Sequence, residues 1–378
     1  MRPVRTILTA AGINVLLHLY IGLRLLPDLP VPLAVKVLGV AWLALSAVMM
    51  PASLLARRAG EPWADTISWI GLLAMGFFST LLWLTVARDL FLLVAWAIHW
   101  QPAGLAGTSA AVATGLALLV TLAGFVNARR TARVVDVDIP FPGLPDALHG
   151  FTIVQLSDVH VGPTIKRRYI ERIVARVNGL DADVVAITGD LVDGSVPELA
   201  AHTAPLAGLA SRHGTFFVTG NHEYYAGVEP WLEELRRIGL RVLMNEHAVI
   251  DHDGAALVLG GVTDYSGGRF DARHRSDPDA AMANAPGHAS ARILLAHQPR
   301  TAAAAASAGF DLQLSGHTHG GQFWPWNLFV PMQQPYTAGL HRHESMHLYV
   351  SRGTGYWGPP KRFGAPSEIT RVRLVRAD

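Results

Sequence analysis

The chain has 378 residues, of which 51% are hydrophobic and 16% are charged. This composition is too apolar for an ordinary soluble protein, so part of the chain is expected to lie in a membrane. Residues 1–128 hold 7 of the 31 Lys and Arg residues and 4 of the 29 Asp and Glu residues. The remainder is nearly neutral, which argues against nucleic-acid binding through a basic face. The lack of cysteine excludes disulfides, thiolate metal sites and a cysteine nucleophile.

Four uncharged stretches near the N-terminus are long enough to cross a hydrocarbon core, which requires about 20 apolar residues per helix. They cover residues 6–23, 37–56, 66–87 and 104–127. The first has no obvious cleavage site for a signal peptidase and is interpreted as a retained anchor. The apolar pattern continues beyond Arg88 and Asp89 to Trp100, which predicts a segment that lies in the membrane interface.

Arginine clusters near the ends of these stretches predict the orientation in the membrane. The clusters are Arg2 and Arg5, then Arg57 and Arg58, then Arg129, Arg130 and Arg133. Four crossings place all three clusters on one side, and basic residues favour the cytoplasmic side. A multi-pass protein of the inner (plasma) membrane is therefore predicted, with the N-terminus and everything after residue 129 in the cytoplasm. Transport by residues 1–128 is an alternative, although these residues show no acidic relay or internal repeat.

From about residue 133, short β-branched runs alternate with amphipathic stretches, which is typical of an α/β domain. The first strand is predicted at a sheet edge and is stopped by Pro140 and Pro142. We divide the chain into a transmembrane domain (1–128), a linker with this edge strand (129–150) and an α/β domain (151–378). Strands are predicted over residues 133–139, 151–156, 184–188, 215–219, 255–260, 292–296, 311–314 and 347–350, and helices over 167–177 and 230–238.

Five polar clusters follow strands of the α/β domain, at the edge where open α/β sheets bind ligands. Each cluster alone is weak evidence, because Asp-x-His, Gly-Asp and Gly-Asn are common in turns and His297 also fits a buried histidine of the core. Two histidines two positions apart beside a glycine, however, contribute nothing to a core. A mixture of carboxylate, imidazole and one amide oxygen without sulfur suits Mn²⁺, Fe or Zn²⁺. In chain order the clusters are Asp158-Val159-His160, Gly189-Asp190-Leu191-Val192-Asp193, Gly220-Asn221-His222-Glu223, His297 and Gly316-His317-Thr318-His319.

This ordered set resembles the signature of the calcineurin-like metallophosphoesterases: Asp-x-His, Gly-Asp-x-x-Asp, Gly-Asn-His-Glu, His and Gly-His-x-His, with every position filled. The similarity runs from about Arg133 to the C-terminus. Gly320-Gly321-Gln322, and Gly353-Thr354-Gly355 with Pro359 and Pro360, resemble the membrane-tethered branch, which includes proteins similar to UDP-2,3-diacylglucosamine pyrophosphatases of lipid A synthesis. The resemblance implies a metallophosphoesterase-type α/β sandwich of two mixed sheets flanked by helices, following a transmembrane region of four helices.

The resemblance also implies two divalent metal ions, which would be Mn²⁺, Zn²⁺ or Fe. Two such ions activate a water molecule and neutralise charge on the attacked phosphoryl group. The ligand set implied by the resemblance is Asp158, His160 and His319 for one ion, Asn221, His297 and His317 for the other, and Asp190 as the bridge.

His222 and Asp190 are the expected catalytic residues. His222 matches the histidine that protonates the departing oxygen in this family, and Asp158 or another carboxylate is expected to orient it. Asp193 and Glu223 are assigned to the orientation of ligands. A second pair of histidines, His341 and His343, is predicted to lie in a loop and outside the ligand set.

The predicted function is a membrane-anchored binuclear-metal phosphoesterase that hydrolyses a phosphoester or pyrophosphate bond. One hypothesis for the substrate is a lipid-linked phosphoester such as UDP-2,3-diacylglucosamine. The alternative is a catalytically silent membrane sensor or scaffold with a phosphoesterase-like domain. The complete donor set counts against a silent domain, because loss of function usually removes a ligand first. The sequence predicts no nucleic-acid partner and does not fix the oligomeric state.

Overall fold

The computed structural model describes residues 2–56 and 63–377, and the chain forms two compact units. The first unit comprises Met1–Val126 and Gly358–Phe363, and the second comprises Asn127–Trp357 and Gly364–Asp378. Arg57 and Arg58, which contribute to the predicted orientation, lie outside the described residues.

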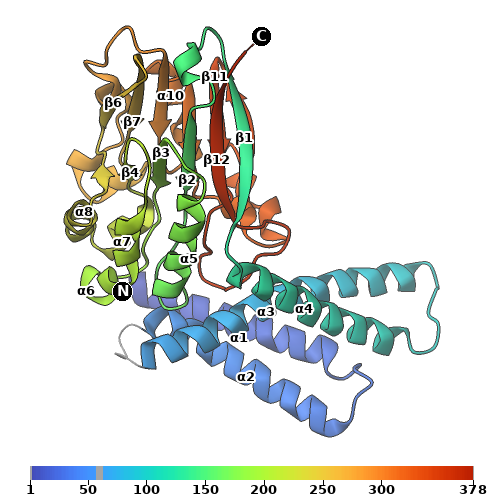
Figure 1. The fold of residues 1–378 in the computed structure, drawn as a ribbon. Coiled ribbons are helices and arrows are strands. Elements are labelled where there is room, and N and C mark those ends of the chain that lie inside the picture. Colours follow the sequence, from blue (N-terminus) through green and yellow to red (C-terminus); the bar gives the residue numbers. More distant parts are fainter. Residues whose placement is uncertain (1, 57–62, 378) are drawn as a thin grey trace. The chain divides into compact units, whose positions relative to one another are not determined.

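Four long helices make up most of the first unit (Figure 1). Each is long and apolar enough to cross a membrane, which confirms the prediction of four apolar helices. The segment expected in the membrane interface is part of the third helix, which passes unbroken through Arg88 and Asp89 over 35 residues. The helices are α1 (Arg2–Leu25), α2 (Leu33–Leu55), α3 (Trp63–Ala97) and α4 (Leu105–Arg129).

The charges inside α3 are tolerated because the neighbouring helices supply hydrogen-bond partners. Arg88 donates to the carbonyl of Arg24 at 2.7 Å and to Ser109 Oγ at 3.0 Å. Asp89 accepts from Arg24 Nε at 2.9 Å and from the hydroxyl of Tyr20 at 2.7 Å. Neither charged side chain therefore requires the helix to end.

The Gly358–Phe363 segment packs on α3 and α4 although it lies far from them in sequence. Lys361 donates from Nζ to the carbonyl of Gly76 at 3.0 Å and to Thr121 Oγ1 at 3.1 Å, and Arg362 N donates to the carbonyl of Gly124 at 2.9 Å. A Cβ atom at Gly124 would lie 2.7 Å from Lys361 Cγ. The glycine thus permits the close approach of this segment.

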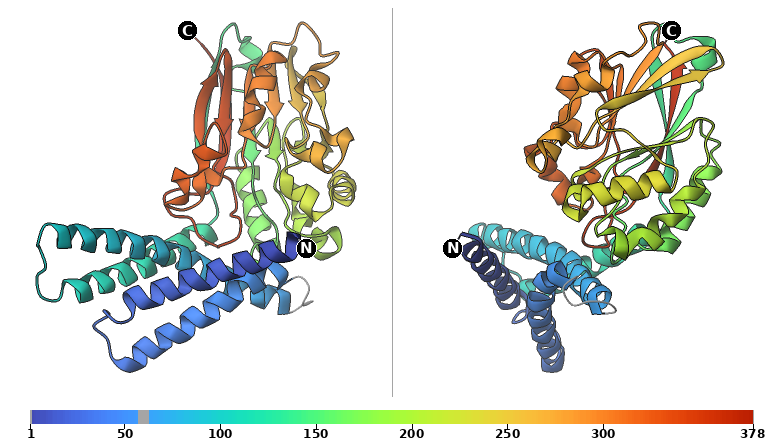
Figure 2. Two further views of the ribbon diagram at one scale, coloured as in Figure 1. Left: turned by 180° about the vertical axis from the view of Figure 1, so that it is seen from behind. Right: turned by 90° about the vertical axis from the view of Figure 1, so that its left-hand side faces the viewer.

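The second unit contains two six-stranded mixed sheets (Figure 2). The first has the order β1-β12-β2-β3-β4-β5, and the second has the order β10-β11-β9-β8-β7-β6. The first sheet consists of β1 (Arg133–Phe141), β12 (Glu368–Arg376), β2 (Thr152–Leu156), β3 (Val184–Thr188), β4 (Thr215–Val218) and β5 (Arg241–Val242). The second consists of β10 (Gly339–His343), β11 (Met346–Val350), β9 (Leu312–Ser315), β8 (Ala291–Leu295), β7 (Ala255–Gly261) and β6 (Glu246–His252).

Apolar side chains pack in three layers around these sheets. The central core lies between the inner faces of the two sheets, where Ile153 and Phe216 meet Leu257 and Ile293. The outer face of the first sheet is covered by α5 (Arg167–Asn178), α6 (Val196–Thr203) and α8 (Val228–Arg237). The outer face of the second is covered by α9 (Pro278–Met282) and α10 (Ala302–Ser307). The predicted class of two mixed sheets flanked by helices is confirmed.

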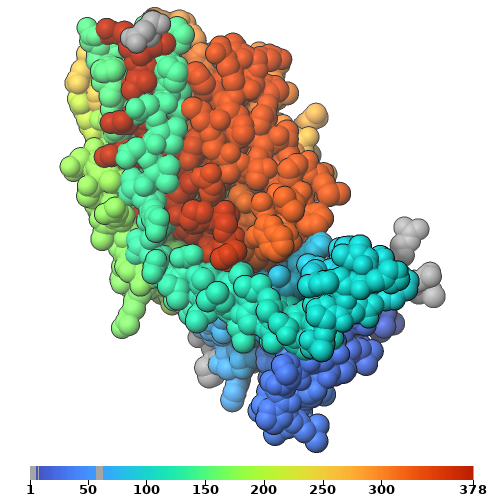
Figure 3. All heavy atoms as spheres, turned by 90° about the vertical axis from the view of Figure 1, so that its right-hand side faces the viewer, coloured from blue at the N-terminus to red at the C-terminus, as the bar shows by residue number. Residues whose placement is uncertain are grey.

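The edge strand β1 lies beside β12, the last strand of the chain, as the teal and red atoms of Figure 3 show. The two strands are parallel, and Arg371 of β12 bonds Asp136 of β1, 235 positions away in sequence. Pro140 does not stop β1 as expected. It pairs with Val375 inside the strand, because at a sheet edge one side of the strand needs no partner.

Candidate metal centre

Six of the seven predicted metal ligands converge at the carboxyl ends of parallel strands, and the seventh, Asn221, follows a neighbouring strand of the first sheet. Asp158 follows β2, Asp190 follows β3 and Asn221 follows β4 in the first sheet. His297 follows β8 and His317 follows β9 in the second sheet. Each sheet thus contributes polar side chains to the same end of the sandwich.

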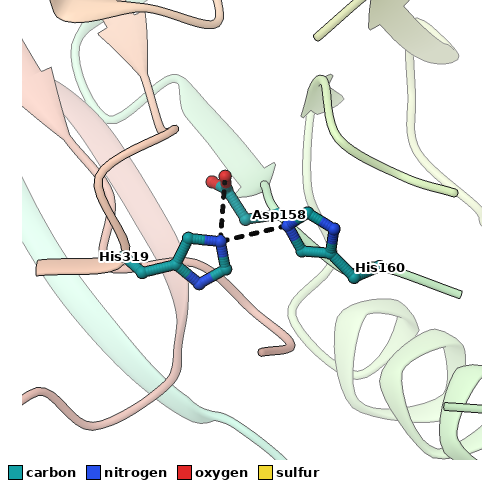
Figure 4. A group of neighbouring side chains, drawn as sticks. All are labelled: Asp158, His160 and His319. Carbon is teal, nitrogen blue, oxygen red and sulfur yellow. Dashed lines mark hydrogen bonds and ion pairs between the residues drawn. The ribbon is translucent and has the colours of Figure 1, made fainter. Parts of the chain in front are cut away.

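The first group consists of Asp158, His160 and His319 (Figure 4). The Nε2 atoms of His160 and His319 lie 3.0 Å apart, and Asp158 Oδ1 lies 3.5 Å from His319 Nε2. All three side chains are buried, and one ligand atom of each lies within 4.8 Å of the others. This spacing suits three donors around one ion.

The second group consists of Asp190, His297 and His317. His297 Nε2 lies 3.1 Å from Asp190 Oδ2 and 3.2 Å from His317 Nδ1. The other ring nitrogen of His297 bonds the carbonyl of Thr188 at 2.8 Å, so Nδ1 carries the hydrogen and the lone pair of Nε2 faces the group. Asp190 Oδ2 also lies 3.9 Å from His160 Nε2, which places this carboxylate between the two groups.

Several features of this arrangement fit a pair of divalent metal ions. Asn221 Oδ1 is buried and has no hydrogen-bond partner among the described residues, so a ligand is needed to satisfy it. Imidazole nitrogens face one another in both groups, which leaves lone pairs pointing at shared space. The donors are carboxylate, imidazole and amide groups without sulfur, as first-row divalent ions and Zn²⁺ accept.

Two glycines of the motifs are required by close packing. A Cβ atom at Gly220 would lie 2.2 Å from Asp190 Oδ1, and one at Gly316 would lie 2.2 Å from Asp158 Oδ2. Such distances exclude any side chain. These two glycines therefore allow the strand-end loops to approach the carboxylates directly. Gly189 is required for a different reason, because its backbone adopts a positive φ of 83°.

His222 is oriented by Asp193, which is a carboxylate other than Asp158 and thus the second of the two expected alternatives. Asp193 Oδ1 lies 2.6 Å from His222 Nδ1 and 3.0 Å from His160 Nδ1. The carboxylate therefore positions one predicted metal ligand and the predicted acid together, because the loop after β3 brings it between the two rings. Burial lowers the pKa of His222, but the Asp190 carboxylate and the hydrogen bond to Asp193 outweigh burial and raise this pKa to about 9.

Glu223 is fully buried and holds the loop that carries Asp190. Its carboxylate accepts hydrogen bonds from the backbone N–H groups of Asp190 at 3.0 Å, Leu191 at 2.7 Å, Val192 at 3.2 Å and Gly220 at 2.6 Å. Burial, followed by the charge of Asp190, raises the pKa of Glu223 to about 7. The side chain thus fixes the loop that positions the Asp190 carboxylate.

Three exposed aromatic side chains beside His222 are absent from the sequence prediction. The rings of Tyr225 and Trp357 lie edge-on to His222, with centroids at 5.2 and 5.7 Å, and Phe270 packs edge-on against Tyr225. We call Tyr225, Phe270 and Trp357 the aromatic rim. Gln322 and the backbone of Trp357 exchange two hydrogen bonds of 2.8 Å, which fix this part of the rim.

The second pair of histidines lies in β10, so the prediction of a loop there is wrong. His341 pairs with Leu348 and His343 with Met346 of β11. His343 Nδ1 also bonds the hydroxyl of Tyr336 at 2.9 Å. Neither ring joins the groups of possible metal ligands among the described residues.

Comparison with known proteins identifies the family. Residues 151–321 match the family model described as calcineurin-like phosphoesterase. An uncharacterized metallophosphoesterase of Aquifex aeolicus is 34% identical over 224 residues, which cover 59% of this chain and 84% of that protein. The chain therefore belongs to the calcineurin-like phosphoesterase family.

Some relatives of this chain are named as transmembrane proteins. A protein of Danio rerio called transmembrane protein with metallophosphoesterase domain is 41% identical over 288 residues, covering 70% of this chain and 63% of that protein. The matched region thus spans about three fifths of that longer relative. Among solved structures, a protein from Staphylococcus aureus titled putative 5'-nucleotidase is 13% identical, and the match covers 61% of this chain and 55% of that chain with a TM-score of 0.39.

Proposed function

We propose that the protein is a membrane-anchored phosphoesterase that uses two divalent metal ions. The observation that carries this proposal is the convergence of six donor side chains into two adjacent groups, with Asp190 of the second group 3.9 Å from His160 of the first. The buried, unpartnered Oδ1 of Asn221 supplies the seventh proposed donor. The site would take one ion at Asp158, His160 and His319 and the other at Asn221, His297 and His317. Bound there, the two ions would supply an activated water molecule and neutralise charge on the phosphoryl group.

The surrounding residues hold and move a proton. His222 Nδ1 faces Asp193, so its Nε2, which lies 4.0 Å from Asp190, is the nitrogen that presents a proton to the departing oxygen. Asp193 stabilises the protonated ring and fixes its orientation. Asp193 also fixes the tautomer of His160 and directs the Nε2 lone pair of that ring to the first group.

The substrate that we propose is an amphipathic phosphoester or pyrophosphate, such as a nucleotide-linked lipid of the UDP-2,3-diacylglucosamine type. The aromatic rim supports this proposal, because exposed rings beside the acid suit the apolar part of a substrate better than a small hydrophilic one. The four apolar helices support it as well, since a membrane anchor raises the rate of encounter with a lipid. The ions are proposed to be Mn²⁺, Zn²⁺ or Fe.

Detergent-purified protein loaded with Mn²⁺ tests these statements. Release of UMP from UDP-2,3-diacylglucosamine supports the proposal of a lipid-linked substrate. Cleavage of bis(p-nitrophenyl) phosphate alone would contradict that proposal and would still support a phosphoesterase. Replacing Asp190 by Asn is expected to abolish both reactions. If neither substrate is hydrolysed by the metal-loaded wild type, and the same holds across a panel of phosphomonoesters and diesters, the silent scaffold is the better description.

The α/β unit is proposed to lie in the cytoplasm, with the four helices in the inner membrane. Arg129 at the end of α4, together with Arg130 and Arg133 after it, supports this orientation. A reporter fused after residue 130 tests it. Green fluorescent protein should fluoresce at this junction, and active alkaline phosphatase there would reverse the orientation.

A further inference from the structure

An elongated apolar groove lies within the first unit, between helices α1, α2, α3 and α4. Its volume is about 950 Å³, and the side chains around it are almost all Leu, Ile, Val, Phe and Trp. The hairpin of α1 and α2 and the hairpin of α3 and α4 diverge towards their turns in Figure 1. The side chains of the four helices therefore do not fill the space between them. In this respect the bundle differs from the interior of a soluble protein, which is packed to high density.

The groove runs along the helix axes. The lining residues extend over 35–46 on α2, 70–81 on α3 and 114–125 on α4. At a rise of 1.5 Å per residue, each stretch is about 16 Å long. The groove is thus a long slot whose length is close to half the thickness of a hydrocarbon core of about 30 Å, that is, one leaflet.

The apolar lining and the shape of the groove indicate which kind of molecule fits it. Water is disfavoured, because the volume corresponds to roughly 30 water molecules at about 30 Å³ each and few polar atoms face it. Extended hydrocarbon chains one leaflet long match both the length and the chemistry.

A cation stands at the end of the groove where α1 and α2 meet. Lys36 follows Val35, which lines the groove, and its Nζ donates to the carbonyl of Pro27 at 2.8 Å. The two aspartates at this end are already engaged, Asp28 by Arg88 and Asp89 by Arg24. Among the described residues no carboxylate pairs with Lys36, so its charge is available to an anionic group at the membrane interface.

We propose that this groove binds the acyl chains of an anionic phospholipid whose phosphate lies beside Lys36. The site is separate from the metal centre and does not depend on hydrolytic activity. It makes a bound lipid part of the folded membrane unit, in which hydrocarbon fills space that the helices leave open.

Photolabelling of the full-length protein in nanodiscs of zwitterionic phosphatidylcholine tests the proposal. The probe is phosphatidylglycerol with a diazirine on one acyl chain, and the labelled residues are identified by mass spectrometry. The critical variant is Leu122→Trp, since Leu122 lines the groove and is 63% exposed. Its matched control is Leu119→Trp on the same helix, since Leu119 is 62% exposed and does not line the groove.

Saturable labelling concentrated on groove residues is expected in the wild type and in Leu119→Trp. Leu122→Trp should lose about tenfold in labelling, the equivalent of displacing two methylene groups from an apolar site. Lys36→Gln should keep the labelled positions and lose about fivefold in preference for phosphatidylglycerol over a phosphatidylcholine probe. Unfolding temperatures of all variants in the nanodiscs show whether the fold is retained. If Leu122→Trp does not fold, Leu38→Trp in the groove and Val40→Trp outside it repeat the comparison on α2.

Three results would overturn the proposal. Labels spread evenly over all lipid-facing positions would show ordinary solvation by the bilayer. Equal labelling of the two α4 variants would show that the groove contributes nothing to binding. Absence of saturable labelling at groove residues would show that lipid does not occupy the groove, as expected if a second protomer fills it.

Discussion

Replacing Glu223 by Gln is expected to loosen the loop that carries Asp190. The Glu223 carboxylate accepts four backbone hydrogen bonds, two at each oxygen, and the side chain is fully buried. A glutamine has the same shape, but one of its two terminal atoms is an NH₂ donor. Two backbone N–H groups therefore lose their acceptor and face another donor.

The magnitude follows from the number of unpaired groups. Each buried donor without a partner costs about 1–3 kcal/mol, so two cost about 2–6 kcal/mol. The loss acts on the loop after β3, where the N–H groups of Asp190, Leu191 and Val192 bond the carboxylate. Opening of this loop should become more frequent by about thirtyfold or more, at about 1.4 kcal/mol per factor of ten.

Amide hydrogen exchange followed by mass spectrometry measures this opening on the peptide that spans residues 189–194. Glu233→Gln is the control, because Glu233 is an exposed residue of α8 and should leave the exchange unchanged. Glu223→Gln should also weaken metal binding, since the bridging Asp190 moves with the loop. Unchanged exchange of this peptide in Glu223→Gln would refute the reasoning that the carboxylate holds the loop.

Three further outcomes are expected at the metal centre. Protein kept in free metal ion at about 100 times the dissociation constant of each site should lose about 2.7 kcal/mol of stability per ion, or about 5 kcal/mol in total, when the two ions are chelated. The unfolding temperature of the α/β unit should then fall by roughly 10–20 °C, as measured by scanning fluorimetry. His222→Gln should lower kcat by about 10²–10⁴ for alkyl esters and far less for p-nitrophenyl esters, whose leaving group needs no proton; equal losses for both would contradict a role as acid. Asp193→Asn should weaken metal binding by about 10–100-fold through His160, and a titration showing wild-type affinity would contradict that role.

The sequence was sufficient to predict the strand-end residues of the site, because each polar cluster directly follows a buried strand. Alternating β-branched runs place β2, β3 and β4 within one or two residues of their observed bounds. The partner of His222 could not be predicted in the same way. Asp193 reaches both His222 and His160 because the loop after β3 turns back beside β2, where Val161 bridges Val192. That contact depends on tertiary structure and leaves no local pattern.

Two other features could not be predicted from the sequence, because they also depend on contacts between residues far apart in the chain. The last strand, β12, enters the first sheet between β1 and β2, parallel to one and antiparallel to the other. Strand pairing over more than 200 positions has no local signal beyond the alternation of each strand. Helix α3 likewise continues through Arg88 and Asp89 because Tyr20 and Arg24 on α1 bond them, and hydropathy alone does not reveal such partners.

Backbone conformation at the candidate metal centre explains why short sequence patterns point to it. Left-handed φ values between 51° and 71° occur at five of the seven predicted ligands, Asp158, His160, Asp190, His317 and His319. Such conformations cost on the order of 1 kcal/mol or more at a non-glycine residue and persist where surrounding contacts enforce them. Asp is among the residues that tolerate them best, and the adjacent glycines remove the remaining clashes. The same short motifs therefore encode both the donor atoms and the sharp turns that aim them. Long-range structure is needed to bring the strand ends together and to place Asp193 between His222 and His160.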